Sequence, residues 1–166
     1  MIKHKDQRVG VLVDVSNMYH SAKNLFNKRV NFAEVLKEVV AGRQLIRAIA
    51  YVIKTENKDE LNFFEALYQQ GFEVNMKDLQ IFAGGAKKAD WDVGIAVDAI
   101  KLADKLDVVV LVTGDGDFVP LVNYIQNTKA CIVEIAAFRQ TASSKLIEEA
   151  DDFINLSDKK SFLLKK

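Results

Sequence analysis

The sequence has little of the material from which disulfide frameworks, zinc sites and membrane spans are built. Its 166 residues include one cysteine, two histidines, one proline and one tryptophan. Because a single cysteine cannot close an internal disulfide, Cys131 indicates a reducing compartment, and the absence of a CxxC pair disfavours zinc. The longest apolar runs, such as Val108–Val112, are far shorter than the ~20 residues that cross a bilayer, and no signal peptide opens the chain. We therefore expect a cytoplasmic protein without a membrane partner.

The overall composition is that of a folded globular domain. Hydrophobic residues make up 49% of the chain and charged residues 28%, which is unlike a disordered or low-complexity sequence. At roughly 150 residues per domain, the length predicts a single domain over residues 1–158. The remaining basic segment, 159–166, is expected to be a flexible tail.

The two signs of charge are unevenly distributed along the chain. Lysine plus arginine and aspartate plus glutamate each number 23. Residues 1–54 carry ten basic and four acidic side chains, whereas residues 55–120 carry six basic and thirteen acidic ones. A net charge of zero disfavours indiscriminate binding to nucleic acid but permits a local basic track. The basic side chains of the first third that would form it are Lys23, Lys28, Arg29, Arg43 and Arg47.

Apolar runs and amphipathic segments alternate along the whole chain. Short β-branched runs predict strands at 9–15, 44–53, 72–82, 107–113, 130–137 and 153–156. Apolar residues spaced three and four apart predict helices at 16–26, 32–41, 58–70, 90–106, 117–127 and 142–150. Asn31 is expected to cap the second helix, and Asn57 with Glu60 has the spacing of a capping box. Residues 83–89 are expected to form a flexible basic loop.

This alternation predicts a three-layer α/β/α sandwich with a central, mostly parallel sheet, a Rossmann-like arrangement. Sites in such folds lie beyond the carboxyl ends of the strands, at the point where the strand order reverses. Asp14 ends the first predicted strand, and Asp115 and Asp117 follow the fourth. If those two strands are neighbours, the three carboxylates meet at one edge of the sheet.

The long helix before the fourth strand adds further acids. Asp90 and Asp92 open it, and Asp98 interrupts its apolar stretch. Each acid also has a simpler explanation: a turn, a helix cap, a charge at a helix start or, for Asp98, a pair with Lys101. Clustered carboxylates repel one another, and Mg²⁺ or Mn²⁺ removes that cost. We favour a cation site because the simpler explanations would all have to hold at the same sheet edge.

Three segments of the chain, in their order, are similar to a known family. They are VDVSNMY (13–19), KKADWDVGIAVDAIKLA (87–103) and VTGDGDFVPLV (112–122). With the closing LIEEADDFINL, they resemble the NYN domains of the PIN-like nuclease superfamily, in particular the LabA-like bacterial branch, over residues 8–156. The resemblance implies a PIN-like fold, an acidic pocket for Mg²⁺ or Mn²⁺ and metal-dependent cleavage of RNA.

The resemblance also implies roles for individual residues. The metal ligands and catalytic acids would be Asp14, Asp92, Asp115 and Asp117, and Asn17 would be a catalytic companion of Asp14. Asp98 would be an outer acid of the same helix as Asp92. The residues and the resemblance together further predict that Asp90 and Thr113 lie around the ligands, and that Thr113 and Asn17 orient the attacking water or a phosphate oxygen. Lys87 and Lys88, next to the helix start, are expected to contact flanking RNA phosphates. Because Ala89 stands where the family often has glycine, a slip of the local alignment would exchange Asp92 for Asp90.

Two classes of function are compatible with these residues. The first is a metal-dependent ribonuclease, for which single-stranded RNA is the favoured partner because its bases can splay. The second is a non-catalytic regulatory module that binds RNA or a nucleotide at the same acidic pocket. A phosphatase of the haloacid-dehalogenase type is disfavoured, since Ser16 stands where that chemistry needs a second aspartate. The sequence is compatible with a homodimer and does not identify the RNA.

Overall fold

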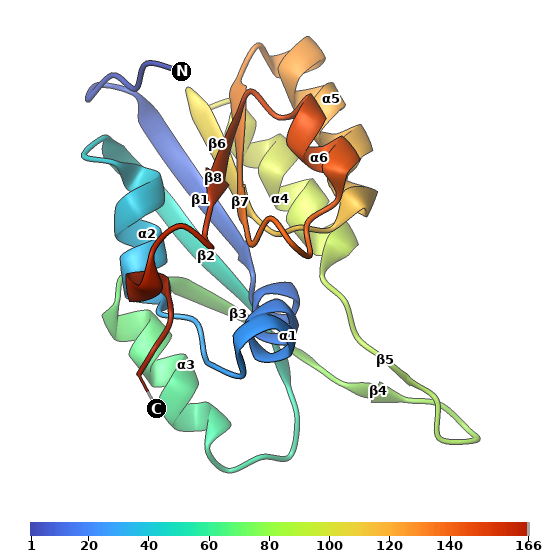
Figure 1. The fold of residues 1–166 in the computed structure, drawn as a ribbon. Helices are drawn as coiled ribbons and strands as arrows, with labels where there is room; N and C mark the ends of the chain where they lie inside the picture. The colour runs from blue at the N-terminus through green and yellow to red at the C-terminus, as the bar shows by residue number, and fades with distance from the viewer. Residues whose placement is uncertain (166) are drawn as a thin grey trace.

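The computed structural model describes residues 1–165, and its centre is a six-stranded parallel sheet (Figure 1). The strands run in the order β3-β2-β1-β6-β7-β8, and every neighbouring pair is parallel. Their bounds are β1 (Arg8–Asp14), β2 (Gln44–Lys54), β3 (Glu73–Asp78), β6 (Val108–Val112), β7 (Ile132–Ala137) and β8 (Asp152–Asn155). The order reverses between β1 and β6, which lie side by side. The predicted fold class is therefore confirmed, and so is this pairing.

Helices cover both faces of the sheet and complete the three layers (Figure 1). One face carries α1 (Val15–Phe26), α2 (Phe32–Val40) and α3 (Glu60–Gln69); the other carries α4 (Asp92–Ala103), α5 (Val119–Lys129) and α6 (Ser144–Glu149). Alternate strand residues enter two separate cores, since Val11 and Val13 face the first and Leu12 the second. Within residues 1–165, no helix is long and apolar enough to cross a membrane.

Local hydrogen bonds explain where two of the helices begin. The side-chain oxygen of Asn31 accepts from the backbone N–H of Glu34 at 3.3 Å, so the predicted cap of α2 is confirmed. The predicted capping box of Asn57 and Glu60 is wrong, because α3 begins only at Glu60. The Glu60 carboxylate instead accepts from the backbone N–H of Thr55 at 2.9 Å. It therefore holds the loop that follows β2 rather than the start of its own helix.

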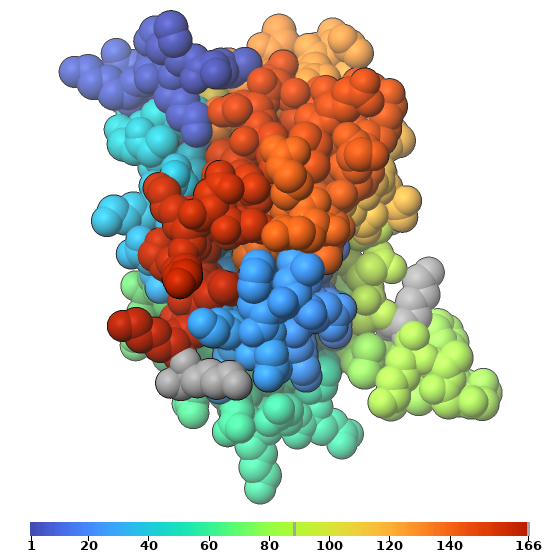
Figure 2. Space-filling view, viewed as in Figure 1, coloured from blue at the N-terminus to red at the C-terminus, as the bar shows by residue number. Residues whose placement is uncertain are grey.

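The segment 83–89, expected to be a flexible loop, instead belongs to a β-hairpin up to residue 88. Gly84 and Gly85 have φ values of 95° and 86°, a backbone conformation that glycine adopts without strain. The hairpin projects from the sandwich and carries an exposed Lys87, while the side chain of Lys88 lies outside the described part of the chain (Figures 1 and 2). Its two antiparallel strands are β4 (Gln80–Ile81) and β5 (Lys87–Lys88).

The basic tail is docked on the sandwich, which differs from the flexible segment expected. The short 3-10 helix η2 (Lys160–Phe162) buries the ring of Phe162 in the core, where 2% of the residue is exposed. The Phe162 carbonyl accepts from the backbone N–H of Asn31 at 2.7 Å, and the N–H of Leu164 donates to the carbonyl of Arg29 at 2.8 Å. This segment, red in Figures 1 and 2, lies against α1 and α2.

Two arginines of the basic first third are used by the fold. The side chains of Arg43 and Glu134 are each 1% exposed and form a bidentate ion pair at 2.8 and 2.9 Å. Arg47 pairs with Glu73 of β3 at 2.6 Å. Because both guanidinium groups already have carboxylate partners, the expected basic track is reduced to Lys23, Lys28 and Arg29.

We expect Phe162→Ala to lower the free energy of unfolding by about 3 kcal/mol, because it leaves a cavity where an aromatic ring is buried. Chemical denaturation followed by circular dichroism measures the change. Leu164→Ala is the control: this side chain is 42% exposed, and we expect a change within about 0.5 kcal/mol. Equal stability of Phe162→Ala and the parent protein would contradict the docked tail.

Candidate functional site

Three aspartates from two separate elements meet at the carboxyl edge of the sheet. Asp92 is the first residue of α4, and Asp115 and Asp117 lie in the turn after β6, which contains the 3-10 helix η1 (Gly116–Phe118). One carboxylate oxygen of each aspartate lies within 4.8 Å of the other two. Asp92 and Asp115 are half-buried and Asp117 is exposed, so the cluster is accessible from solvent.

Asp14 is the buried acid of the site and ends β1. Since Val13 pairs with Val112 of β6, the following residues, Asp14 and Thr113, emerge next to each other. The Asp14 carboxylate accepts from the Thr113 hydroxyl at 3.4 Å and from the backbone N–H of Asn17 at 3.3 Å. It is 9% exposed. A cavity of about 370 Å³ is lined by Asp14 together with Asp90, Asp92 and Asp115.

Asn17 and Thr113 hold the turn that carries two of the acids. The Asn17 side-chain oxygen accepts from the backbone N–H of Gly114 at 3.0 Å, which ties α1 to the end of β6. The Thr113 hydroxyl accepts from the N–H of Asp115 at 3.2 Å. The Asp115 carboxylate in turn accepts from the N–H of Asp117 at 2.9 Å. The structure thus places both predicted polar residues beside the acids, where they orient the turn.

The two glycines of the TGDGD segment allow a neighbouring loop to approach the turn. A Cβ at Gly114 would lie 2.9 Å from the Cα of Ala142, and one at Gly116 would lie 2.8 Å from the hydroxyl of Ser143. The backbone N–H of Ser143 also donates to the Gly114 carbonyl at 2.9 Å. The loop before α6 therefore clamps the acidic turn, and larger residues at either glycine would displace it.

Burial and repulsion raise the pKa of two of the acids. Burial is the main cause for Asp14, whose pKa is raised further by the negative charge of Asp115. The pKa of Asp92 rises to about 6, first through burial and then through the charges of Asp115 and Asp90. The cluster therefore disfavours its own ionised form, and a positive charge between the carboxylates would relieve the repulsion.

The start of α4 is anchored by two residues that sequence reasoning did not assign to the site. The indole N–H of Trp91 donates to the carbonyl of Val52 at 2.9 Å, which holds the helix start against the end of β2. The Lys77 ammonium donates to the Asp90 carbonyl at 2.8 Å and lies 4.3 Å from the centre of the Trp91 ring. Both therefore position Asp92. Trp91 directly precedes that acid, whereas Lys77 comes from β3 and no local pattern identifies it.

The structure brings most, but not all, of the predicted acids together. Asp90 lines the cavity, yet its carboxylate accepts from the backbone N–H of Asp92 at 3.2 Å. Of these two candidates for the helix-start acid, Asp92 is the one that joins Asp115 in the cluster. Asp98 lies apart from that group, because its carboxylate accepts from the hydroxyl of Tyr51 at 2.7 Å.

The predicted phosphate contact on the hairpin also falls outside the acidic cavity. Lys87 is exposed and lines a neighbouring cavity of about 540 Å³. The two cavities share several residues, including Ser16 and His20 of α1 and Ala89 after the hairpin. Lys87 thus lines a cavity that adjoins the acidic one, and it does not line the acidic cavity itself.

Comparison with known proteins agrees with this geometry, since residues 8–157 match the model of the NYN domain. The chain belongs to the NYN domain family. It is 24% identical over 172 residues to the "Low amplitude and bright protein LabA" of Synechococcus elongatus, covering 97% of this chain and 90% of that protein. It also superimposes on the crystal structure of a Vibrio parahaemolyticus protein of unknown function, with a TM-score of 0.89 and 32% identity, over 99% of this chain and 100% of that one.

The donor set of this NYN domain is suitable for a hard divalent cation. Mg²⁺ binds oxygen at about 2.1 Å in octahedral geometry, so adjacent ligands lie about 3 Å apart and opposite ligands about 4.2 Å apart. One oxygen of each of Asp92, Asp115 and Asp117 lies within 4.8 Å of the other two, and small side-chain rotations would bring the three to these spacings. The exposed side of the cluster leaves room for the waters that Mg²⁺ retains. The acidic cluster of the NYN domain therefore fits such an ion.

We expect Asp92→Asn to raise the melting temperature of the metal-free protein at pH 8, because it removes a carboxylate whose charge is disfavoured. Recovery of ~1 kcal/mol corresponds to about 2–4 °C. The pKa of Asp92 is about 6 in the folded protein and near 4 in an unfolded chain, so the penalty is absent below both values. The gain should therefore disappear between pH 6 and pH 4.

Thermal unfolding in chelator at pH 8, 6 and 4 measures this effect. Asp104→Asn, at the C-terminal end of α4, is the matched control and should show no such pH-dependent gain. A lower melting temperature for Asp92→Asn at pH 8 would show that the carboxylate is stabilised in the fold instead.

Proposed function

We propose that this NYN domain is a metal-dependent ribonuclease that hydrolyses phosphodiester bonds of RNA at the acidic cavity. The observation that carries the proposal is the convergence of three carboxylates within 4.8 Å at the sheet edge where β1 and β6 end. The buried Asp14 lines the acidic cavity together with Asp92 and Asp115. Membership of the NYN domain family, with its PIN-like nuclease fold, supports the assignment.

The acids have two different parts in this proposal. Asp92, Asp115 and Asp117 would hold Mg²⁺ or Mn²⁺, with Asp14 contributing charge from below. When bound, the cation would polarise the scissile phosphate and lower the pKa of a water molecule beside it. Asp14 also keeps the end of β1 in place by accepting from Thr113 and Asn17.

Asn17 would orient the substrate. Its side-chain oxygen is occupied by the N–H of Gly114, which fixes the plane of the amide. The amide nitrogen lies on the same rigid group, and Asn17 lines the acidic cavity. Its N–H groups would therefore donate to a phosphate oxygen of the RNA, while Thr113 keeps the turn of Asp115 in position.

The substrate that fits this arrangement best is single-stranded RNA. A metal-bridged acidic site holds the phosphate backbone, and a single strand lets neighbouring bases turn away from it. The same cavity would also serve a regulatory NYN domain that binds metal and RNA without cleaving the strand. The assay below distinguishes these two cases.

We expect the purified protein to cleave end-labelled single-stranded RNA in Mn²⁺, and chelator to abolish the cleavage. Asp14→Asn and Asp115→Asn should each lower the rate by at least about 100-fold, because they remove charge from the cation site. Asp104→Asn, which makes the same change on the exposed end of α4, should stay within about twofold of the parent rate.

Calorimetric titration with Mn²⁺ accompanies the cleavage assay. Cleavage that persists in Asp14→Asn or in chelator would overturn the assigned centre. If Mn²⁺ binding depends on Asp115 but no tested RNA is cleaved, the result would favour the regulatory module over the nuclease.

A further inference from the structure

Three cavities follow one another along the exposed face of α1. The acidic cavity shares Ser16 and His20 with a neighbour, and that neighbour shares Tyr19 with a third cavity. Lys23 and Asn27 of the third cavity continue the same spacing of three and four residues. Residues with that spacing lie on one face of a helix. A single helix face therefore connects the acids to the far end of α1.

The third cavity, named here the basic cavity, has a volume of about 540 Å³ and is rich in cations. It is lined by Tyr19, Lys23, Asn27, Lys28, Arg29, Leu164 and Lys165. Among the residues that the structure describes, no carboxylate side chain is part of this lining. Across residues 1–165, none of its four cationic side chains forms an ion pair, unlike Arg43 and Arg47. Uncompensated positive charge around a hollow is complementary to the phosphates of a polyanion.

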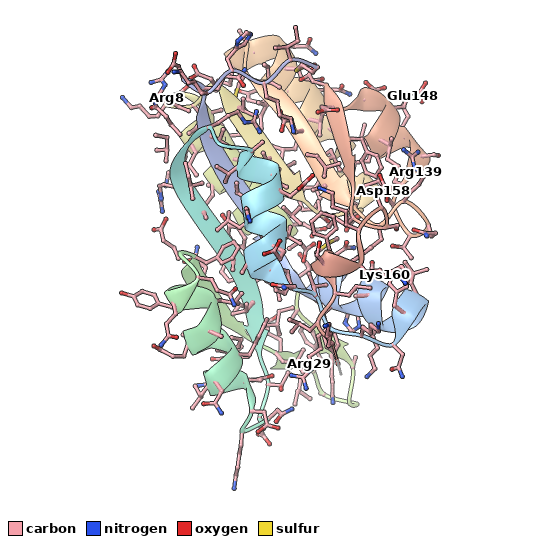
Figure 3. All side chains as sticks on the ribbon, turned by 60° about the vertical axis from the view of Figure 1, so that its left-hand side comes forward. Arg8, Arg29, Arg139, Glu148, Asp158 and Lys160 are labelled. Atoms are coloured by element: carbon pink, nitrogen blue, oxygen red, sulfur yellow. The ribbon has the colours of Figure 1, made fainter. Side chains whose placement is uncertain are left out.

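The docked tail builds one wall of the basic cavity. The backbone N–H of Leu164 donates to the Arg29 carbonyl at 2.8 Å, and Leu163 pairs with Val30. These contacts bring Lys165 to the same cavity as Arg29, although the two residues are far apart in the sequence. Figure 3 shows Arg29 at the end of the molecule that carries α1, and Arg8 at the opposite end. Four cationic side chains are therefore gathered around one cavity at the C-terminal end of α1.

The middle cavity offers aromatic surface between the acidic and the basic cavities. Tyr19 and Phe63 line it and are 43% and 37% exposed. His20 lines it as well, with its ring 5.3 Å from that of Tyr19. Exposed rings beside a basic track stack unpaired bases of single-stranded nucleic acids, in a manner tolerant of sequence.

The length of α1 sets the distance between the acids and the most remote cations of the basic cavity. Asp14 caps the N-terminal end of this helix, and Asn27, which precedes Lys28 and Arg29, caps the C-terminal end; the twelve helical residues between them rise about 18 Å. At ~3.4 Å per stacked nucleotide, about five nucleotides cover this distance. A trinucleotide bound at the acids does not reach Lys28 and Arg29 at the other end of the helix.

We propose that one RNA strand runs along α1, from the acidic cavity over Tyr19 and Phe63 to the basic cavity. Lys28, Arg29 and Lys165 bind phosphates there, remote from the bond that is cleaved. The basic cavity thereby favours strands of about five nucleotides or more over shorter ones. The position of the cleaved bond rests on the proposed function, whereas RNA binding in the basic cavity does not.

The test compares two double variants with the same change of charge. Lys28→Glu with Arg29→Glu alters the basic cavity, and Lys101→Glu with Lys105→Glu alters exposed residues near the end of α4, on the other face of the sheet. Binding of a labelled RNA decanucleotide is measured by fluorescence anisotropy in chelator, at several salt concentrations. Cleavage of the decanucleotide and of a trinucleotide is measured in Mn²⁺.

We expect the basic-cavity variant to weaken decanucleotide binding at least about tenfold and to reduce the salt slope by about 1.4, the value for two phosphates of a single strand. Its trinucleotide cleavage should be unchanged, and the α4 variant should resemble the parent in both assays. Equal losses in the two variants, or no loss in either, would overturn the proposal. If no RNA is cleaved but the two variants still differ in binding, the proposed nuclease activity is wrong and the proposed RNA path stands.

Discussion

The pairing of β1 with β6 is the constraint on which the rest of this structure depends. It places Asp14 and Thr113 beside each other at the carboxyl edge and starts the turn of Asp115 at the same point. Bringing carboxylates together there opposes folding, as the raised pKa of Asp92 shows. Contacts elsewhere in the sheet must therefore outweigh this repulsion. β6 is fully buried, and the buried ion pair of Arg43 with Glu134 joins the segment before β2 to β7.

The sequence predicts those parts of the fold that depend on residues close together in the chain, such as apolar runs and helix caps. The buried run Val108–Val112 has no other plausible place than the middle of a parallel sheet, and the cap at Asn31 forms with a residue three positions away. Asp14 and Asp115 stand out because each follows such a run. Their meeting requires only that the two strands be neighbours, which the reversal of strand order in doubly wound sheets supplies.

The parts that the sequence does not predict depend on contacts between distant segments. Lys77 acts on the site by reaching the Asp90 carbonyl from another strand, and nothing around it in the sequence marks that role. The tail has four lysines among its eight residues, yet the buried ring of Phe162 and backbone hydrogen bonds to Arg29 and Asn31 dock it on the sandwich. Asp98 lies in α4 like Asp92, but its carboxylate accepts a hydrogen bond from the hydroxyl of Tyr51 and does not join the acidic cluster. In each of these three examples, the role of the residue depends on a partner that is far away in the sequence.

The two charged regions of the molecule lie at opposite ends of α1, and each has the sign that the helix dipole favours at its end. Asp14 caps the N-terminal end of this helix, where partial positive charge favours an anion, and Lys23 lies in its last turn, where a cation is favoured. Acidic residues at the N-terminal end of α1 and basic residues at its C-terminal end therefore stabilise the helix, and the proposed RNA path uses the same arrangement of charges. Because the acids alone repel phosphate, a strand held by the basic end would approach them productively only once a cation is present. The net charge of zero is therefore the sum of an acidic region at the N-terminal end of α1 and a basic region at its C-terminal end. The proposed RNA strand would run between these two regions.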